Sequence, residues 1–294
     1  PLDHSCVVNI LNKIRSYGHY VEVLPVDGNG DLLVEESIEI IDGFDRVSSQ
    51  DKIVNYTFIK NETGVVWPLS IAEKIKRETS ARVICDAVQA PGKTPNWAKL
   101  SGDLDAYSFS AHKFGAMKGT GFTFVKDSYE LNPLIIGGGQ NQGLRSGTEN
   151  LLNIYTIKLA LEDLIKEAAA ENYYEWFLSN KLEVEELILS FIKEERLIVS
   201  RKAKNRNLNT INFVVPKVKS NTFMTALDLL GLEVSSGSAC SSGASLPNRV
   251  LLELGYTREE SECGIRLSLG GSMERIPFNE IKNKLATALE KYYH

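Results

Sequence analysis

Cysteine and histidine are scarce in this sequence of 294 residues, which contains four of each. The cysteines lie far apart and form no C-x-x-C pair, so a disulfide framework and a structural zinc site are both disfavoured. Four scattered histidines do not favour a histidine-rich metal centre either. We therefore expect no metal ion, and a reduced compartment such as the cytoplasm.

Long apolar runs and an excess of positive charge are also absent. No stretch approaches the length of a membrane span, and the first residues contain no apolar signal segment. The formal net charge of −5 gives no reason to expect nucleic acid or an anionic membrane as a partner. With 43% hydrophobic and 24% charged residues, the composition is typical of a globular protein with one large or two ordinary domains.

Strand and helix patterns alternate along most of the chain, which implies βα units and a mainly parallel sheet. Strands are predicted at 20–26, 53–59, 82–85, 107–109, 122–125, 197–200, 209–215 and 264–269. Helices are predicted between them, and a long helical region covers 149–192. The fold class is therefore α/β. We expect a large domain over 1–170 and a smaller α/β domain over 171–294.

Polar side chains follow three of the predicted strands at the point where each strand ends. Asn61 follows the second strand and Asp86 the third, while Ser110, His112 and Lys113 follow the fourth. Ligands bind beyond the carboxyl ends of parallel strands, so we expect these side chains to form one site.

Lys113 is the residue on which this site is centred. Burial at the end of a strand would lower the pKa of its amine and leave a nucleophile able to form a Schiff base. Taken alone, the segment from Ser110 to Lys113 is as compatible with an ordinary loop lysine as with a catalytic one. An amine, an acid at a strand end and the thiol of Cys240 in a Ser/Gly-rich loop together suggest pyridoxal phosphate chemistry with a second nucleophile. Asp86 would then pair with the ring nitrogen.

Two more residues are candidates for the same site, and each has an ordinary structural alternative. Gln89 could reach the phenolic oxygen of the cofactor, and His4 could lie on its ring. Asp86 could equally be a helix N-cap, and His4 a capping residue. Only the joint placement of these side chains favours the functional interpretation.

These residues resemble those of the cysteine desulfurases, pyridoxal-phosphate enzymes of fold type I with an aspartate-aminotransferase-like fold. The resemblance is closer to the branch that serves nitrogenase and housekeeping iron–sulfur assembly. The matching segments keep the family's order along the whole chain: Asn61–Val66, Asp86–Gln89, Ser108–Lys113, Gly137–Thr148, Ser236–Cys240 and Ile265–Gly270.

The resemblance implies a role in cofactor binding for several residues. Lys113 would hold pyridoxal 5'-phosphate covalently, Asp86 would contact its ring nitrogen, and His4 would stack on its ring and move protons. The other contacts would come from Asn61, Gln89, Ser110, His112 and, across a two-fold homodimer, Thr148.

The resemblance also implies the reaction. Arg266, with Asn61, would bind the carboxylate of L-cysteine, and Cys240 would take its sulfur as a persulfide, leaving L-alanine. A sulfur-acceptor or scaffold protein is then expected as a partner in iron–sulfur cluster assembly. A selenocysteine lyase and a non-catalytic scaffold of the same fold are the alternatives, whereas an aminotransferase has no need of Cys240.

The chain departs from the family pattern at three places. Lys60 stands where the family usually has asparagine, and Trp67 stands where it often has glutamine. We expect neither to touch the core chemistry, and Trp67 to alter a partner surface. The family's N-terminal segment also has no counterpart upstream of His4. We therefore expect the 294 residues alone to fold poorly or to bind cofactor weakly unless that segment is present in the molecule.

Overall fold

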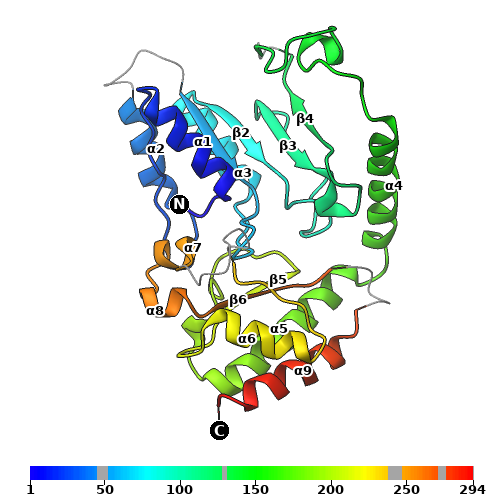
Figure 1. The fold of residues 1–294 in the computed structure, drawn as a ribbon. Coiled ribbons are helices and arrows are strands. Elements are labelled where there is room, and N and C mark those ends of the chain that lie inside the picture. The colour runs from blue at the N-terminus through cyan, green and yellow to red at the C-terminus, as the bar shows by residue number, and fades with distance from the viewer. Residues whose placement is uncertain (45–51, 128–130, 238–246, 271–275, 294) are drawn as a thin grey trace.

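The computed structural model describes residues 1–44, 52–127, 131–237, 247–270 and 276–293, and Cys240 lies outside this part of the chain. Its strands form two sheets, one of four strands and one of two (Figure 1). In Figure 1 the larger sheet lies in the upper part of the molecule, with α1, α2 and α3 on one side and α4 on the other.

The larger sheet confirms the expected mainly parallel arrangement. It has the order β1 (Ile53–Thr57), β2 (Arg82–Asp86), β3 (Ala106–Ser110) and β4 (Gly121–Val125). The first three strands are parallel, and β4 is antiparallel to β3.

Helices enclose the apolar faces of both sheets. Their bounds are α1 Ser5–Ser16, α2 Val34–Gly43, α3 Leu69–Thr79, α4 Leu151–Ala168, α5 Tyr173–Ile192, α6 Ser220–Leu229, α7 Arg249–Glu253, α8 Arg258–Ser261 and α9 Phe278–Glu290. Short 3₁₀ turns lie at Ala111–Phe114 (η2), Asn141–Gly143 (η3) and Glu195–Leu197 (η4). None of the described helices combines the length and the apolar character needed to cross a membrane.

The core of the larger sheet is formed by the inward-facing side chains, which alternate with outward-facing ones along its strands. In β1 and β2, Tyr56, Val83 and Cys85 are fully buried, and Ile75 of α3 packs into the same cluster. Burying such side chains contributes roughly 1.5–3 kcal/mol each, which is enough to fix which face of each strand points inward.

The second sheet pairs β5 (Thr210–Val214) with β6 (Gly264–Ser268) in antiparallel fashion. All five residues of β5 are buried, so this strand has no solvent-facing side. Residues of α5, α6 and α9 complete its core, which also takes in Leu2 from the other end of the chain.

Two strand predictions are wrong. Residues 20–26 form no strand: only Val26 makes an isolated bridge, to Leu32, while Tyr20 and Val23 are exposed. An alternating pattern needs a neighbouring strand to pair with, and none pairs with this segment among the described residues. Residues 197–200 instead begin with the 3₁₀ turn η4 and continue as a turn with a single bridge from Ile198 to Phe213.

A buried charged cluster joins α5 to the segment before β5. Arg206 binds Glu185 through both Nη atoms, at 2.6 and 3.1 Å from its carboxylate oxygens. Lys181 is also buried, and its Nζ donates to the carbonyl of Asn207 at 2.7 Å. Burial and the charge of Arg206 lower the pKa of Lys181 to about 7, against the opposing effect of Glu185.

This pKa predicts a specific pH dependence of stability. Between pH 7 and the ordinary pKa of lysine, the unfolded chain binds the Lys181 proton and the folded chain does not, so stability rises with pH. Relative to a Lys181→Met variant, the wild-type free energy of unfolding should rise by roughly 2 kcal/mol from pH 7 to 9. Urea unfolding of both proteins at the two pH values measures the difference, and parallel pH profiles would contradict the assignment.

Candidate active site

The parallel strands bring the predicted polar residues to one edge of the larger sheet. Asp86, the last residue of β2, lies opposite Thr57 of β1 and Ser108 of β3. Ser110 ends β3, and Asn61 follows shortly after β1. The residues predicted to follow the strand ends therefore lie beyond the same edge.

Asp86 is a half-buried carboxylate held at its strand end by the backbone. Its Oδ1 accepts a hydrogen bond from the N–H of Val88 at 3.0 Å. Burial raises the pKa of Asp86, and the carboxylate of Asp3 adds to this effect. The Val88 N–H and the positive charges of Lys60 and His4 act in the opposite direction. A cation against this carboxylate would therefore be bound favourably.

Ser110, His112 and Lys113 come together at the start of η2. The hydroxyl of Ser110 lies 3.0 Å from Nδ1 of His112. The pKa of His112 is lowered, first by lost hydration and then by the charges of Lys113, Lys118 and Lys93. Lys113 is exposed, so the expectation that burial activates its amine is wrong for this structure. Among the described residues its amine has no hydrogen-bond or ion-pair partner.

Arg266 reaches the same region from the second sheet. It lies in β6, and its backbone exchanges hydrogen bonds with Ser235 at 2.6 and 3.0 Å. Its Nη1 donates to the carbonyl of Asn61 at 3.3 Å, whereas its Nε is buried without a partner. A buried, unpaired guanidinium N–H is costly, and a ligand carboxylate would satisfy it in the paired geometry that arginine favours.

His4 forms the N-cap of α1 and is exposed. Its Nδ1 accepts from the backbone N–H of Cys6 at 3.2 Å and lies 3.0 Å from the Cys6 thiol. The preceding residue, Asp3, is bound by Asn55 of β1 and by Lys60, so the start of α1 lies beside the larger sheet. Arg249, at the start of α7, donates to the carbonyl of Asp3 at 2.5 Å. The helix that follows the Cys240 segment is thus tied to the start of α1.

Lys93 is a residue of this site that the sequence interpretation missed. Its amine donates to Oε1 of Gln89, one of the predicted cofactor contacts. Burial lowers the pKa of Lys93 to about 8, and the charges of Lys113 and Arg266 contribute to that shift. The preceding Gly92 has a φ of +73°, and a Cβ there would meet Leu164 of α4 at 2.4 Å. The positive φ favours glycine at this position, and any other residue would also have to displace the Leu164 side chain.

Two predicted residues are not brought into this group. Thr148 is exposed in the segment before α4 and makes no hydrogen bond within the described part of the chain. Cys240 lies outside the described residues.

The residues at this edge fit pyridoxal phosphate. They supply a carboxylate for a protonated ring nitrogen, an unengaged amine, hydroxyl and imidazole donors for a phosphate, and the orphan Nε of Arg266 for a carboxylate. This donor set matches the charges of the cofactor and of an amino-acid substrate.

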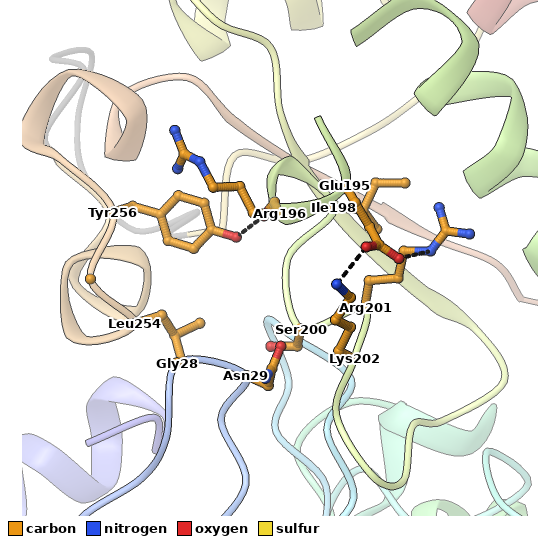
Figure 2. Close-up of a pocket in the computed structure, with 11 residues that line it drawn as sticks. Gly28, Asn29, Glu195, Arg196, Ile198, Ser200, Arg201, Lys202, Leu254 and Tyr256 are labelled. Atoms are coloured by element: carbon orange, nitrogen blue, oxygen red, sulfur yellow. Dashed lines mark hydrogen bonds and ion pairs between the residues drawn. The ribbon is translucent and has the colours of Figure 1, made fainter. Parts of the chain in front are cut away.

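A separate cavity of about 250 Å³ lies between the turn at residues 28–29 and the segments 195–202 and 254–256 (Figure 2). Its lining has three positively charged side chains and one carboxylate, and residues outside the lining supply further negative charges: Glu260 pairs with Arg196 and Glu186 with Arg201. Glu195 accepts from Lys202 at 2.6 Å and lies 3.7 Å from Nε of Arg201, while the Tyr256 hydroxyl donates to the carbonyl of Arg196. This cavity contains none of the residues predicted for the site.

Comparison with known proteins places the chain in a family. The class-V aminotransferase family matches residues 1–276. The chain belongs to this family, whose members have the pyridoxal-phosphate type I fold and depend on that cofactor.

Individual relatives and solved structures are similar over most of the chain. The cysteine desulfurase IscS of Clostridium botulinum is 30% identical over 273 residues, which make up 92% of this chain and 66% of that protein. The cysteine desulfurase NifS of Azotobacter vinelandii is 30% identical over 277 residues, or 94% of this chain and 66% of that protein. A NifS-like protein from Rickettsia africae superposes with a TM-score of 0.77 at 26% identity, covering 99% of this chain and 73% of the other. The chain thus spans about two thirds of the length of the curated relatives.

The position of Lys93 yields a test of the site's electrostatics. Lys113→Met removes a neighbouring positive charge, so the pKa of Lys93 should rise above its value of about 8. Reductive ¹³C-methylation followed by NMR titration of the lysines measures this pKa. Lys126→Met, near the end of β4 away from η2, is the control and should leave it unchanged. An unaltered Lys93 titration in Lys113→Met would show that the two amines are not neighbours.

Proposed function

We propose that the protein is a pyridoxal-phosphate-dependent cysteine desulfurase, which converts L-cysteine to L-alanine and supplies sulfur for iron–sulfur cluster assembly. The observation that supports this most directly is the meeting of Asp86, the Ser110–Lys113 segment and the unpaired Nε of Arg266 at one sheet edge. The relatives named cysteine desulfurase favour this activity over a selenocysteine lyase or a non-catalytic scaffold.

The residues of the sheet edge would divide cofactor binding among them. Lys113 would hold the cofactor covalently, and Asp86 would keep its ring nitrogen protonated. Ser110 and His112 would donate to its phosphate, while Asn61 and Gln89 contact the ring substituents. When bound, the cofactor supplies an electron sink for cleavage next to the substrate's α-carbon. His4 would lie on the ring face and move a proton to or from the substrate carbon.

Arg266 would orient the substrate. Its Nη1 donates to the carbonyl of Asn61, and its buried Nε has no acceptor among the described residues. The carboxylate of L-cysteine would supply that acceptor. Binding there would fix the substrate's thiol relative to the small domain that carries Cys240.

Cys240 would carry out the sulfur transfer. Its thiolate attacks the sulfur of the substrate, so that an S–S bond forms and the substrate's C–S bond breaks. The carbon keeps the electron pair and is protonated. The balance is one thiol and one L-cysteine giving one persulfide and one L-alanine, with no external oxidant. A sulfur-acceptor protein then removes the terminal sulfur.

The organisation of the chain supports two domains, 1–170 and 171–294. Their proposed boundary falls between α4 and α5, and each sheet has its own large core cluster. The core cluster of the two-stranded sheet includes Leu2, so the first residues of the chain pack with the small domain. A cytoplasmic location agrees with the three described cysteines, which are all free.

We also propose a homodimer, with a second copy covering α4 and the segment before it. No residue of α4 is buried, and Leu151, Leu152 and Tyr155 are 76%, 67% and 55% exposed. Leu134 and Ile136 in the preceding segment are 93% and 86% exposed. So many large apolar side chains exposed on neighbouring segments of the chain are typical of subunit interfaces. Such a contact would bring Thr148 to the phosphate of the partner's cofactor.

The function is tested by removing the sulfur carrier. Cys240→Ser should bind L-cysteine, detected as a change in the cofactor's visible spectrum, but release at least about 100-fold less sulfide and alanine. Cys263→Ala, which alters a buried thiol of the same domain, should retain activity if it folds. Wild-type protein that binds the cofactor and yet releases no sulfide from L-cysteine would contradict the proposal, as would normal turnover by Cys240→Ser.

The dimer is tested by placing charge on the apolar face of α4. Leu152→Glu/Leu159→Glu should shift the protein to a monomer in sedimentation velocity, because two carboxylates would lose their hydration in the interface. Leu229→Glu, at an 81% exposed position on α6, is the matched control and should stay dimeric. A monomeric wild type at micromolar concentration would contradict this interface.

A further inference from the structure

Lys60 is a lysine whose side chain is completely buried. Its Nζ lies 2.7 Å from Oδ1 of Asp3 and 3.4 Å from the centre of the Trp67 ring. An isolated cation would not remain charged in such a place. Here a carboxylate lies on one side and the electron-rich face of an indole on the other, and both stabilise the ammonium form.

Trp67 is held in place by its own hydrogen bond. It is 4% exposed, and its Nε1 donates to the carbonyl of Gly30 at 2.9 Å. The expectation that Trp67 alters a partner surface is therefore wrong. Lys60 and Trp67 are the two positions where the sequence departs from the usual family residues, and the structure shows that they contact each other. The two departures form one feature.

Asp3 is the residue through which Lys60 reaches the start of α1. Its Oδ1 binds Lys60, its Oδ2 accepts from Asn55 at 3.3 Å, and its carbonyl accepts from Arg249. His4 follows directly as the N-cap of α1. Asp3 is therefore held by β1, by Lys60 and by α7, and these contacts leave the backbone before His4 little freedom.

Lys60 also acts on Asp86. Asp3, the ion-pair partner of Lys60, also binds Asn55 of β1, and Thr57 of the same strand is in register with Asp86. Burial raises the pKa of Asp86, Asp3 raises it further, and Lys60 lowers it. Burial alone would also raise the pKa of Asp3, but Lys60 holds it low. Two carboxylates thus depend on one buried cation.

We propose that Lys60 is a positioning residue with two effects: through Asp3 it fixes the start of α1 and hence His4, and its charge offsets that of Asp3 beside the strand end where Asp86 would meet the cofactor's ring nitrogen. The second effect rests on the proposed function, because it requires that the protein binds pyridoxal phosphate. The first effect is a property of the cofactor-free protein.

The charge effect is tested with Lys60→Gln, which can still donate a hydrogen bond to Asp3 but carries no charge. Asp3 and Asp86 would then face each other without a cation, and the Kd for pyridoxal phosphate, titrated into cofactor-free protein, should rise roughly tenfold. Lys60→Gln/Asp3→Asn removes the extra carboxylate as well. Its Kd should return to within about threefold of wild type.

The positioning effect is tested in the absence of cofactor. The imidazole NMR signals of His4, assigned by comparison with His4→Gln, should shift and broaden in Lys60→Met, which cannot hydrogen-bond Asp3. They should stay close to wild type in Lys60→Gln. Lys181→Gln is the matched control, because Lys181 is also a fully buried lysine but lies in the other proposed domain. This change should alter neither the His4 signals nor the Kd.

The outcomes separate the inference from the proposed function. If Lys60→Gln binds cofactor like wild type, or if the double variant stays as weak as the single one, the charge effect is refuted. Unchanged His4 signals in Lys60→Met refute the positioning effect. A wild type that does not bind pyridoxal phosphate refutes the proposed function, while the His4 signals still decide the positioning effect. If Lys60→Met fails to fold, Asp3→Ala replaces it, with the same expected change at His4.

Discussion

The parallel pairing of β1, β2 and β3 is the constraint on which the site depends. Parallel strands run in the same direction, so whatever follows each strand emerges at one edge of the sheet. The register sets Asp86 opposite Ser108, and the chain then needs only a few residues to bring Ser110, His112 and Lys113 beyond it. The antiparallel β4 returns along β3, so that Gly121 pairs with Ser110 and closes the same edge.

The second sheet matters because its Arg266 brings a guanidinium to the edge where the polar residues of the first sheet meet. The turn after β1 is bound to it by several polar contacts. Asn212 of β5 donates to the carbonyl of Glu62 at 3.0 Å, and Asn248 donates to the carboxylate of the same residue at 2.7 Å. Arg266 binds the carbonyl of Asn61, the neighbouring residue. One short turn therefore carries both a predicted cofactor contact and the attachment of Arg266, the arginine proposed to bind the substrate.

The fold class and the placement of Asp86 and Ser110 at strand ends could be predicted from the sequence because both depend on local patterns. Alternating strand and helix periods are visible in the chain, and Asp86 and Ser110 end their strands as expected. The strand predicted at 20–26 is wrong because pairing depends on a neighbour that the pattern does not specify. The exposure of Lys113 and the burial of Lys60 were missed for a similar reason: burial depends on which distant segments cover a residue.

The environments of the cations at this edge show why an anionic ligand suits it. Lys60 has a carboxylate partner and is buried as part of an ion pair. Lys93, Lys113 and Arg266 make no ion pair with any carboxylate in the described part of the chain, although Lys93 and Arg266 are largely buried. Burial lowers the pKa of both Lys93 and Arg266, so their charged forms are held at a cost in free energy.

A phosphate or carboxylate placed among these cations would recover that cost, because it stabilises the charged forms that burial penalises. The carboxylate of Asp86 lies at the same edge and makes no ion pair in the described part of the chain. It therefore remains available for a cationic ring nitrogen rather than neutralising Lys93 or Arg266. The edge thus presents a carboxylate and separate cations without carboxylate partners, which suits a ligand that carries both charges.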